Sequence, residues 1–79
     1  MQKAKVYVTL RESILDPQGK AVTTGLHKLG FDEVQNVRIG KFIEITMDGG
    51  DESRVTEMCE KLLANYVMED FRIEMEPGK

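Results

Sequence analysis

The sequence has few of the residues from which most metal centres and nucleophilic active sites are built. Its 79 residues include one cysteine, one histidine and no tryptophan. Structural metal sites need clustered Cys and His side chains, so we expect no metal site on this chain. The sequence also has no phosphate-cradling glycine loop, and we expect no cofactor. A single cysteine cannot form an internal disulfide, which suits a reducing compartment and favours a cytoplasmic location.

Long apolar runs and runs of one charge are missing as well. No segment of the sequence is apolar over the length that a membrane span needs, and the first eight residues, MQKAKVYV, lack the apolar run of a signal peptide. Acidic and basic residues are interleaved along the whole chain and give a net charge of −3. The absence of a basic stripe argues against nucleic acid as the main partner, and we expect no membrane partner.

The remaining composition, 41% hydrophobic and 32% charged, is that of a soluble globular protein. The length predicts a single domain over residues 1–79. A chain this short buries only about 60% of its unfolded surface, so its own core should be small. We therefore expect it to share apolar surface with further copies of itself or with another protein.

The first half of the chain predicts a strand followed by a helix. Alternation over Lys3–Leu10 is typical of a half-buried strand, with Ala4, Val6, Val8 and Leu10 on one face. A helix should then run from Pro17 to Leu29, because Asp16 can cap its free N–H groups and proline is favoured at the first helical position. Gly30 should end this helix in a left-handed conformation. The apolar helical stripe consists of Ala21, Val22, Gly25, Leu26 and Leu29.

The next segment predicts a hairpin, with strands over Glu33–Ile39 and Phe42–Met47 and a turn at Gly40. Two registers remain open. A two-residue turn would make the hairpin apolar on both faces, as at a subunit interface. The residues that would then share one face are Val37, Ile39 and Phe42. A three-residue loop would instead build a single core face.

The second half predicts another helix, capped by Asp51 or a neighbour, and a last strand over Asp70–Glu76. The apolar face of this helix carries Val55, Met58, Cys59, Leu62 and Tyr66. The order of elements predicts an α+β ferredoxin-like βαββαβ sandwich, a four-stranded antiparallel sheet with both helices on one face. The uncovered sheet face should carry Lys5, Tyr7, Thr9, Glu44, Thr46, Arg72 and Glu74.

No catalytic constellation emerges from the sequence. Cys59 lies on an apolar helical stripe, so a small core residue is a better interpretation than a nucleophile. His27 falls opposite the apolar stripe of the first helix, which predicts a surface histidine. We therefore expect no catalytic residue on this chain.

The best-placed polar cluster surrounds the start of the first helix. Its members are Arg11, Asp16, Gln18, Gly19 and Lys20. They could bind an anion at the free N–H groups or contact a partner, although Arg11 and Lys20 could equally be solvated. Glycine in a first helical turn costs about 1 kcal/mol against alanine, which a partner backbone packed closely against Gly19 would explain. Together with Val37, Ile39 and Phe42 of the hairpin, these residues form the candidate partner interface.

Five stretches of the sequence carry a resemblance to the PurS family, the small subunit of phosphoribosylformylglycinamidine (FGAM) synthase. They are KVYVTL (5–10), ILDPQGKA (14–21), LGF (29–31), VRIGKFIE (37–44) and CEKLLAN (59–65). The family usually has proline after the equivalent of Asn65, whereas this chain has Tyr66, so the end of the second helix stays open.

The resemblance implies a non-catalytic subunit of a glutamine-dependent ligase of purine biosynthesis, which makes FGAM from formylglycinamide ribonucleotide, ATP and glutamine. In such systems a glutaminase subunit releases ammonia, and a large synthetase subunit binds ATP and magnesium. The small subunit is implied to be a cytoplasmic homodimer or homotetramer that joins the other two and assists ammonia transfer.

Other families share the expected order of elements. An ACT-like small-molecule-sensing regulatory module is the main alternative, with residues 14–19 as its candidate ligand loop. An acylphosphatase-like enzyme would need an arginine in a glycine-rich first loop, and Arg11 precedes no such loop. RNA binding through the open sheet face would rest on Tyr7 alone.

Overall fold

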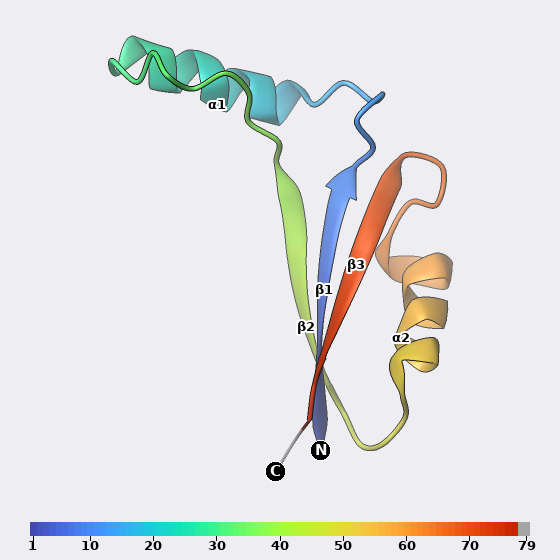
Figure 1. Cartoon of the computed structure of the whole chain (residues 1–79). Coiled ribbons are helices and arrows are strands. Elements are labelled where there is room, and N and C mark those ends of the chain that lie inside the picture. The colour runs from blue at the N-terminus through green and yellow to red at the C-terminus, as the bar shows by residue number, and fades with distance from the viewer. Residues whose placement is uncertain (78–79) are drawn as a thin grey trace.

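The computed structural model describes residues 1–77 and has the α+β class expected from the sequence. Strand β1 (Gln2–Leu10) is followed by helix α1 (Pro17–Lys28) and strand β2 (Gly40–Met47). Helix α2 (Glu52–Met58) continues into a π-helical segment, η1 (Cys59–Leu63), and the chain returns as strand β3 (Glu69–Glu76). The three strands form one antiparallel sheet in the order β2-β1-β3, with β1 in the centre (Figure 1).

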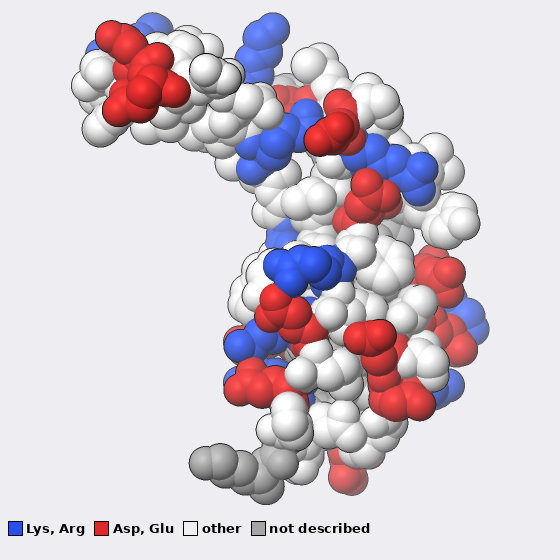
Figure 2. Space-filling model, viewed as in Figure 1, with Lys and Arg blue, Asp and Glu red and all other residues white. Residues whose placement is uncertain are grey.

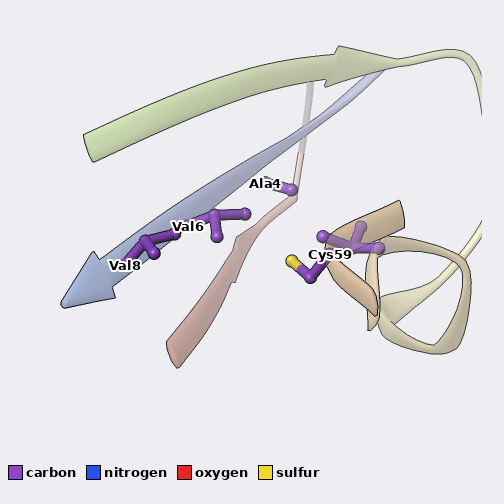
Figure 3. Packing of buried hydrophobic residues seen from close by; sticks show 5 residues of the cluster. Ala4, Val6, Val8 and Cys59 are labelled. Atoms are coloured by element: carbon purple, nitrogen blue, oxygen red, sulfur yellow. The ribbon is translucent and has the colours of Figure 1, made fainter. Parts of the chain in front are cut away.

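The core lies on one face of the sheet, between β1 and α2. Alternation along β1 buries Ala4, Val6 and Val8 completely, as its pattern predicts. Cys59 of η1 faces these residues (Figure 3), and Val55 of α2 belongs to the same fully buried cluster. Apolar side chains of β2 and β3 pack around this cluster but are only partly buried. The core of the chain is therefore small, as its length predicts.

The four-stranded sheet expected from the sequence is wrong, because the sheet has three strands. Residues 33–39 form no strand, and Gly40 is the first residue of β2 rather than a hairpin turn. Both hairpin registers are therefore wrong as well. A Cβ on Gly40 would lie 2.4 Å from the carbonyl oxygen of Val8, so glycine is needed here for the close approach of β2 to β1.

Helix α1 has the expected ends but not the expected place. Asp16 caps its first turn, and Gly30 follows it with a φ of 99°. The helix does not cover the sheet: it extends away from the end of the sheet and makes no extensive contact with any strand or with α2 (Figure 1). Its apolar stripe is exposed as a result, with Leu29 75% exposed. We call residues 11–39, which leave β1 and return to β2, the arm.

The second helix begins as predicted, but its later turn is wound differently. The N–H of Ala64 donates to the carbonyl oxygen of Cys59, a five-residue spacing that adds one residue to the turn. The extra residue places Leu62 in solvent, 83% exposed, and packs Leu63 against the core. The inward positions predicted for Leu62 and Tyr66 are therefore wrong. The end of this helix, which the sequence left open, falls at Leu63.

The sheet face away from α2 carries the polar residues that the alternation predicts. Lys5 lies between Glu44 of β2 and Glu74 of β3 in the strand register. Phe42 joins this face beside Tyr7, with the two ring centroids 5.0 Å apart, and the guanidinium carbon of Arg72 lies 4.2 Å from the Tyr7 centroid. Over the part of the molecule visible in Figure 2, cationic and anionic side chains are interspersed.

Candidate functional site

The base of the arm is held together by one carboxylate. Asp16 accepts a hydrogen bond from the N–H of Gly19 through Oδ1, at 3.0 Å, which caps α1. Its second oxygen, Oδ2, accepts from the N–H of Ile39 at 2.7 Å, just before β2 begins. Asp16 is buried, with 5% of its surface exposed. One side chain therefore joins the outgoing and the returning halves of the arm.

Gly19 allows the returning chain to pass close to the first turn of α1. A Cβ at this position would lie 2.2 Å from the carbonyl oxygen of Val37 and 2.6 Å from Oδ2 of Asp16. The sequence correctly indicated that a backbone passes close to Gly19. The backbone that the structure places there is that of Val37 in the same chain, which accounts for the glycine without a partner.

Arg38 is a member of this site that sequence reasoning did not single out. Its Nη2 donates to the carbonyl oxygens of Leu10, Arg11 and Ile14, at 3.2, 2.8 and 3.2 Å. The guanidinium thus gathers the loop that leads from β1 into α1. A cation between two apolar residues, Val37 and Ile39, was the available signal, but nothing local indicates that its acceptors lie more than twenty residues earlier.

The other predicted interface residues divide into two groups. Gln18 and Lys20 are exposed and line shallow hollows on either side of the arm base, where the half-buried Val37 and Ile39 also lie. Arg11 points elsewhere, because its guanidinium donates to the carbonyl oxygen of Tyr66 at 2.8 Å.

Phe42 lies apart from both groups, on the open face of the sheet. The structure therefore brings together Asp16, Gln18, Gly19, Lys20, Val37 and Ile39, but not Arg11 or Phe42. That any of these residues contacts a partner stays a prediction.

The electrostatics of the arm base favour an ionised Asp16. The hydrogen bond from the N–H of Ile39 lowers the pKa of Asp16 most, followed by the bond from Gly19, and the charge of Arg38 acts in the same direction. Partial desolvation opposes these effects without reversing them. The carboxylate therefore remains charged at neutral pH. Its charge strengthens the two hydrogen bonds that it accepts from Gly19 and Ile39.

Cys59 and His27, the two side chains of types common in catalysis, serve the packing and hydrogen bonding of the fold. Burial raises the pKa of the Cys59 thiol, which is a core side chain as predicted and is poorly suited to act as a thiolate nucleophile. His27 is exposed, as predicted, and its Nε2 donates to the carbonyl oxygen of Val34 at 2.6 Å, tying α1 to the returning chain.

The arm base offers packing and hydrogen bonding rather than reactive groups. Within residues 1–77, no three His, Cys, Asp or Glu side chains are placed to hold a metal ion together. None of the helices in that range has the length and apolar character to cross a membrane.

A family model matches almost the whole chain. The model, described as PurS, phosphoribosylformylglycinamidine (FGAM) synthase, matches residues 3–77. The chain belongs to the PurS family. The PurS subunit of FGAM synthase from Bacillus subtilis is 57% identical over 79 residues, which cover 96% of this chain and 94% of that protein. The PurS subunit from Methanocaldococcus jannaschii is 41% identical over 80 residues, covering 96% of each.

Solved PurS structures have the same fold as this chain. The B. subtilis PurS structure matches with a TM-score of 0.90 at 56% identity, covering 98% of this chain and 100% of that one. The M. jannaschii PurS structure matches with a TM-score of 0.90 at 39% identity, covering 100% of both. A chain of the PurLQS structure from Thermotoga maritima matches with a TM-score of 0.80 at 24% identity, covering 95% of this chain and 98% of that one, a likeness of fold alone.

The family assignment confirms the resemblance and the function that it implied. This PurS chain is a subunit of FGAM synthase, a ligase of purine biosynthesis. The family match therefore favours this function over the ACT-like alternative. The three-stranded sheet with its projecting arm is a PurS fold rather than a four-stranded sandwich.

Two glycines of α1 give opposite expectations for the same substitution. Gly19→Ala should destabilise the protein by about 1–3 kcal/mol, because its Cβ overlaps the Val37 carbonyl. Gly25→Ala should stabilise it by up to about 1 kcal/mol, because a Cβ there has no neighbour within 4 Å and alanine favours helix. Urea unfolding at one protein concentration measures both. Equal stabilisation by the two substitutions would refute the close approach at Gly19.

The stability of the arm base should depend on pH through Asp16. Its folded pKa lies below the ordinary value of 3.8, so its stabilising effect is complete above that pH and is lost as the pH falls through the lowered pKa. The difference in thermal midpoint between wild type and Asp16→Asn should therefore be largest near neutral pH and shrink below pH 3.8. Carboxylates common to both proteins cancel in this comparison. A difference that stays constant down to pH 2.5 would contradict the role of the charge.

Proposed function

We propose that this chain is the non-catalytic adaptor of FGAM synthase, a homo-oligomer that joins the glutaminase and synthetase subunits and assists ammonia transfer between them. The observation that carries the proposal is the amount of surface that the chain leaves uncovered. Its accessible surface is 5980 Å² for a mass of 9.0 kDa. A monomeric protein of this mass exposes about 4,900 Å².

The excess surface is of the size that a stable association removes. It amounts to about 1,100 Å², against about 800 Å² buried per partner in a standard interface. The radius of gyration points the same way, at 15.9 Å against about 12 Å for a compact chain of this length. Figure 2 shows the reason, since the arm curves away from the body and leaves a concave side open.

The uncovered surface is apolar where a second copy would be expected to pack. The stripe of α1 exposes Val22 by 40% and Leu29 by 75%, and Phe31 at the tip of the arm is 48% exposed. On the body, an apolar hollow of about 310 Å³ lies between α2 and β2, lined partly by Ile45 and Leu62. An arm that crosses to the body of a second copy would bury both surfaces at once.

The proposed partners come from the relatives of the chain. Relatives are named subunits of FGAM synthase, and the T. maritima structure that shares the fold is of PurLQS. We expect ATP and magnesium to bind to the synthetase subunit and the glutaminase to supply the ammonia, with no cofactor, nucleic acid or membrane bound by this chain. The reaction has water-soluble substrates and the single thiol suits reducing conditions, so we propose a cytoplasmic location.

The homo-oligomer can be tested at the end of α1. Leu29→Asp should weaken self-association by at least about tenfold, because it places a charge in the proposed apolar contact. Lys28→Asp is the matched control, since it adds the same side chain at the neighbouring exposed position and changes the charge by more. Sedimentation equilibrium gives the dissociation constant and separates dimer from tetramer. A wild-type protein that stays monomeric at micromolar concentrations would overturn the homo-oligomer.

The adaptor role is tested by reconstitution. Glutamine-dependent FGAM formation by the glutaminase and synthetase components should fall strongly when this chain is omitted, because ammonia would then escape to water. Ammonium chloride supplied in place of glutamine should restore part of the synthetase activity without this chain. Glutamine-dependent activity that is unchanged by the omission would refute the adaptor function.

A further inference from the structure

The arm has no broad contact that could fix its direction. α1 makes no extensive contact with the strands or with α2. The two ends of the arm lie side by side, because Thr9 near the end of β1 pairs with Gly40 at the start of β2. Whatever sets the angle between the arm and the sheet must therefore act at the arm base.

Two charged side chains cross that base, and both bind backbone. Asp16 joins Gly19 to Ile39, across the two halves of the arm. Arg38 reaches in the opposite direction, from the returning half to three carbonyl oxygens of residues 10–14. Hydrogen bonds in which one group is charged are shorter and roughly twice as strong as those between neutral groups, and they are directional. We call these two side chains and their bonds the clasp.

We infer that the clasp of Asp16 and Arg38 is the positioning device of the arm, and that it sets the direction in which α1 meets a second copy of the chain. The effect on association with a second copy rests on the proposed homo-oligomer, whereas the effect of the clasp on the arm direction does not. Asp16 is 5% exposed and its oxygens are engaged within the chain, so it acts through the arm rather than by touching a partner. Asp16 thereby receives a different role from the interface contact expected from the sequence.

The clasp predicts a measurable loss of affinity without loss of the sheet. When both partners carry an arm that spends about a third of its time in the competent direction, their association weakens about tenfold. The core of Val6, Val8, Val55 and Cys59 lies on the body and shares no bond with the clasp. Its cooperative unfolding should therefore survive substitutions at the arm base.

Asp16→Asn is the selective variant. The N–H groups of Gly19 and Ile39 bond to different oxygens of Asp16, and in asparagine an NH2 donor replaces one of these oxygens, so one of the two bonds is lost. Asparagine remains a good helix cap. Arg38→Met removes the second half of the clasp. Lys20→Met is the control, because Lys20 is an exposed cation lining the same hollow and makes no bond that crosses the base.

The arm direction can be measured by pulsed electron spin resonance within one chain. Spin labels at Lys28→Cys, at the end of α1, and Thr46→Cys, on the open face of β2, report the distance between arm and sheet. Cys59 is buried, and wild type treated with the spin-label reagent serves as the check that Cys59 takes up no label. An excess of unlabelled protein ensures that each labelled protomer associates only with unlabelled copies.

We expect a narrow distance distribution in the labelled parent and in Lys20→Met, and a broad or shifted one in Asp16→Asn and Arg38→Met. Circular dichroism should show the sheet intact in all four, and sedimentation should show about tenfold weaker association for the two clasp variants. Unchanged distributions in the clasp variants, or equal broadening in Lys20→Met, would overturn the inference. A monomeric wild type would refute the proposed homo-oligomer alone, since the intramolecular distances still decide the role of the clasp.

Discussion

The structure depends on a single carboxylate that bonds to two backbone N–H groups from different parts of the chain. Asp16 caps the first turn of α1 and also fixes Ile39, the last residue before β2. Without the second bond, Arg38 would be left to connect the returning chain to the loop that leads into the helix. Gly19 complements this arrangement, because only glycine lets the Val37 carbonyl come so close to the helix. A stretch that begins as an ordinary helix start therefore also determines where the chain re-enters the sheet.

This arrangement explains why the chain is suited to be a subunit. A helix laid over the sheet would have completed a compact sandwich, whereas a helix held at the end of the sheet leaves apolar surface on both the arm and the body. Among residues 1–77, the fully buried apolar cluster contains five residues. In the proposed homo-oligomer, association would supply the burial that the isolated chain lacks, so folding and assembly would draw on the same apolar residues. A PurS chain built this way needs no reactive side chain of its own to contribute to a ligase.

Local pattern was enough to predict β1, β3, both helix starts and the Gly30 end of α1, because each depends on residues within a few positions. It failed at residues 33–39, where the alternating Val37 and Ile39 imitate a strand although the N–H of Ile39 is bonded to Asp16, more than twenty positions away. The sequence predicts a turn at Gly40, because it does not show which backbone a glycine lets approach. The prediction also failed at η1, where the extra residue of the π-helical turn places Leu62 in solvent, although a regular helical repeat would place it inward.

The candidate site also shows that a local sequence pattern does not identify the surface against which a helix packs. The helical spacing of apolar residues along α1 predicts that one face will be buried, whereas the structure leaves that face exposed within the chain. It carries no information on whether the covering surface belongs to the same chain, and the shortest topology, a helix folded back on its own sheet, was therefore assumed. The residues that decide otherwise are Asp16, Gly19 and Arg38, whose effect lies in distant backbone contacts. In a short chain with a small core, an amphipathic helix is thus as much evidence for a partner as for a tertiary fold.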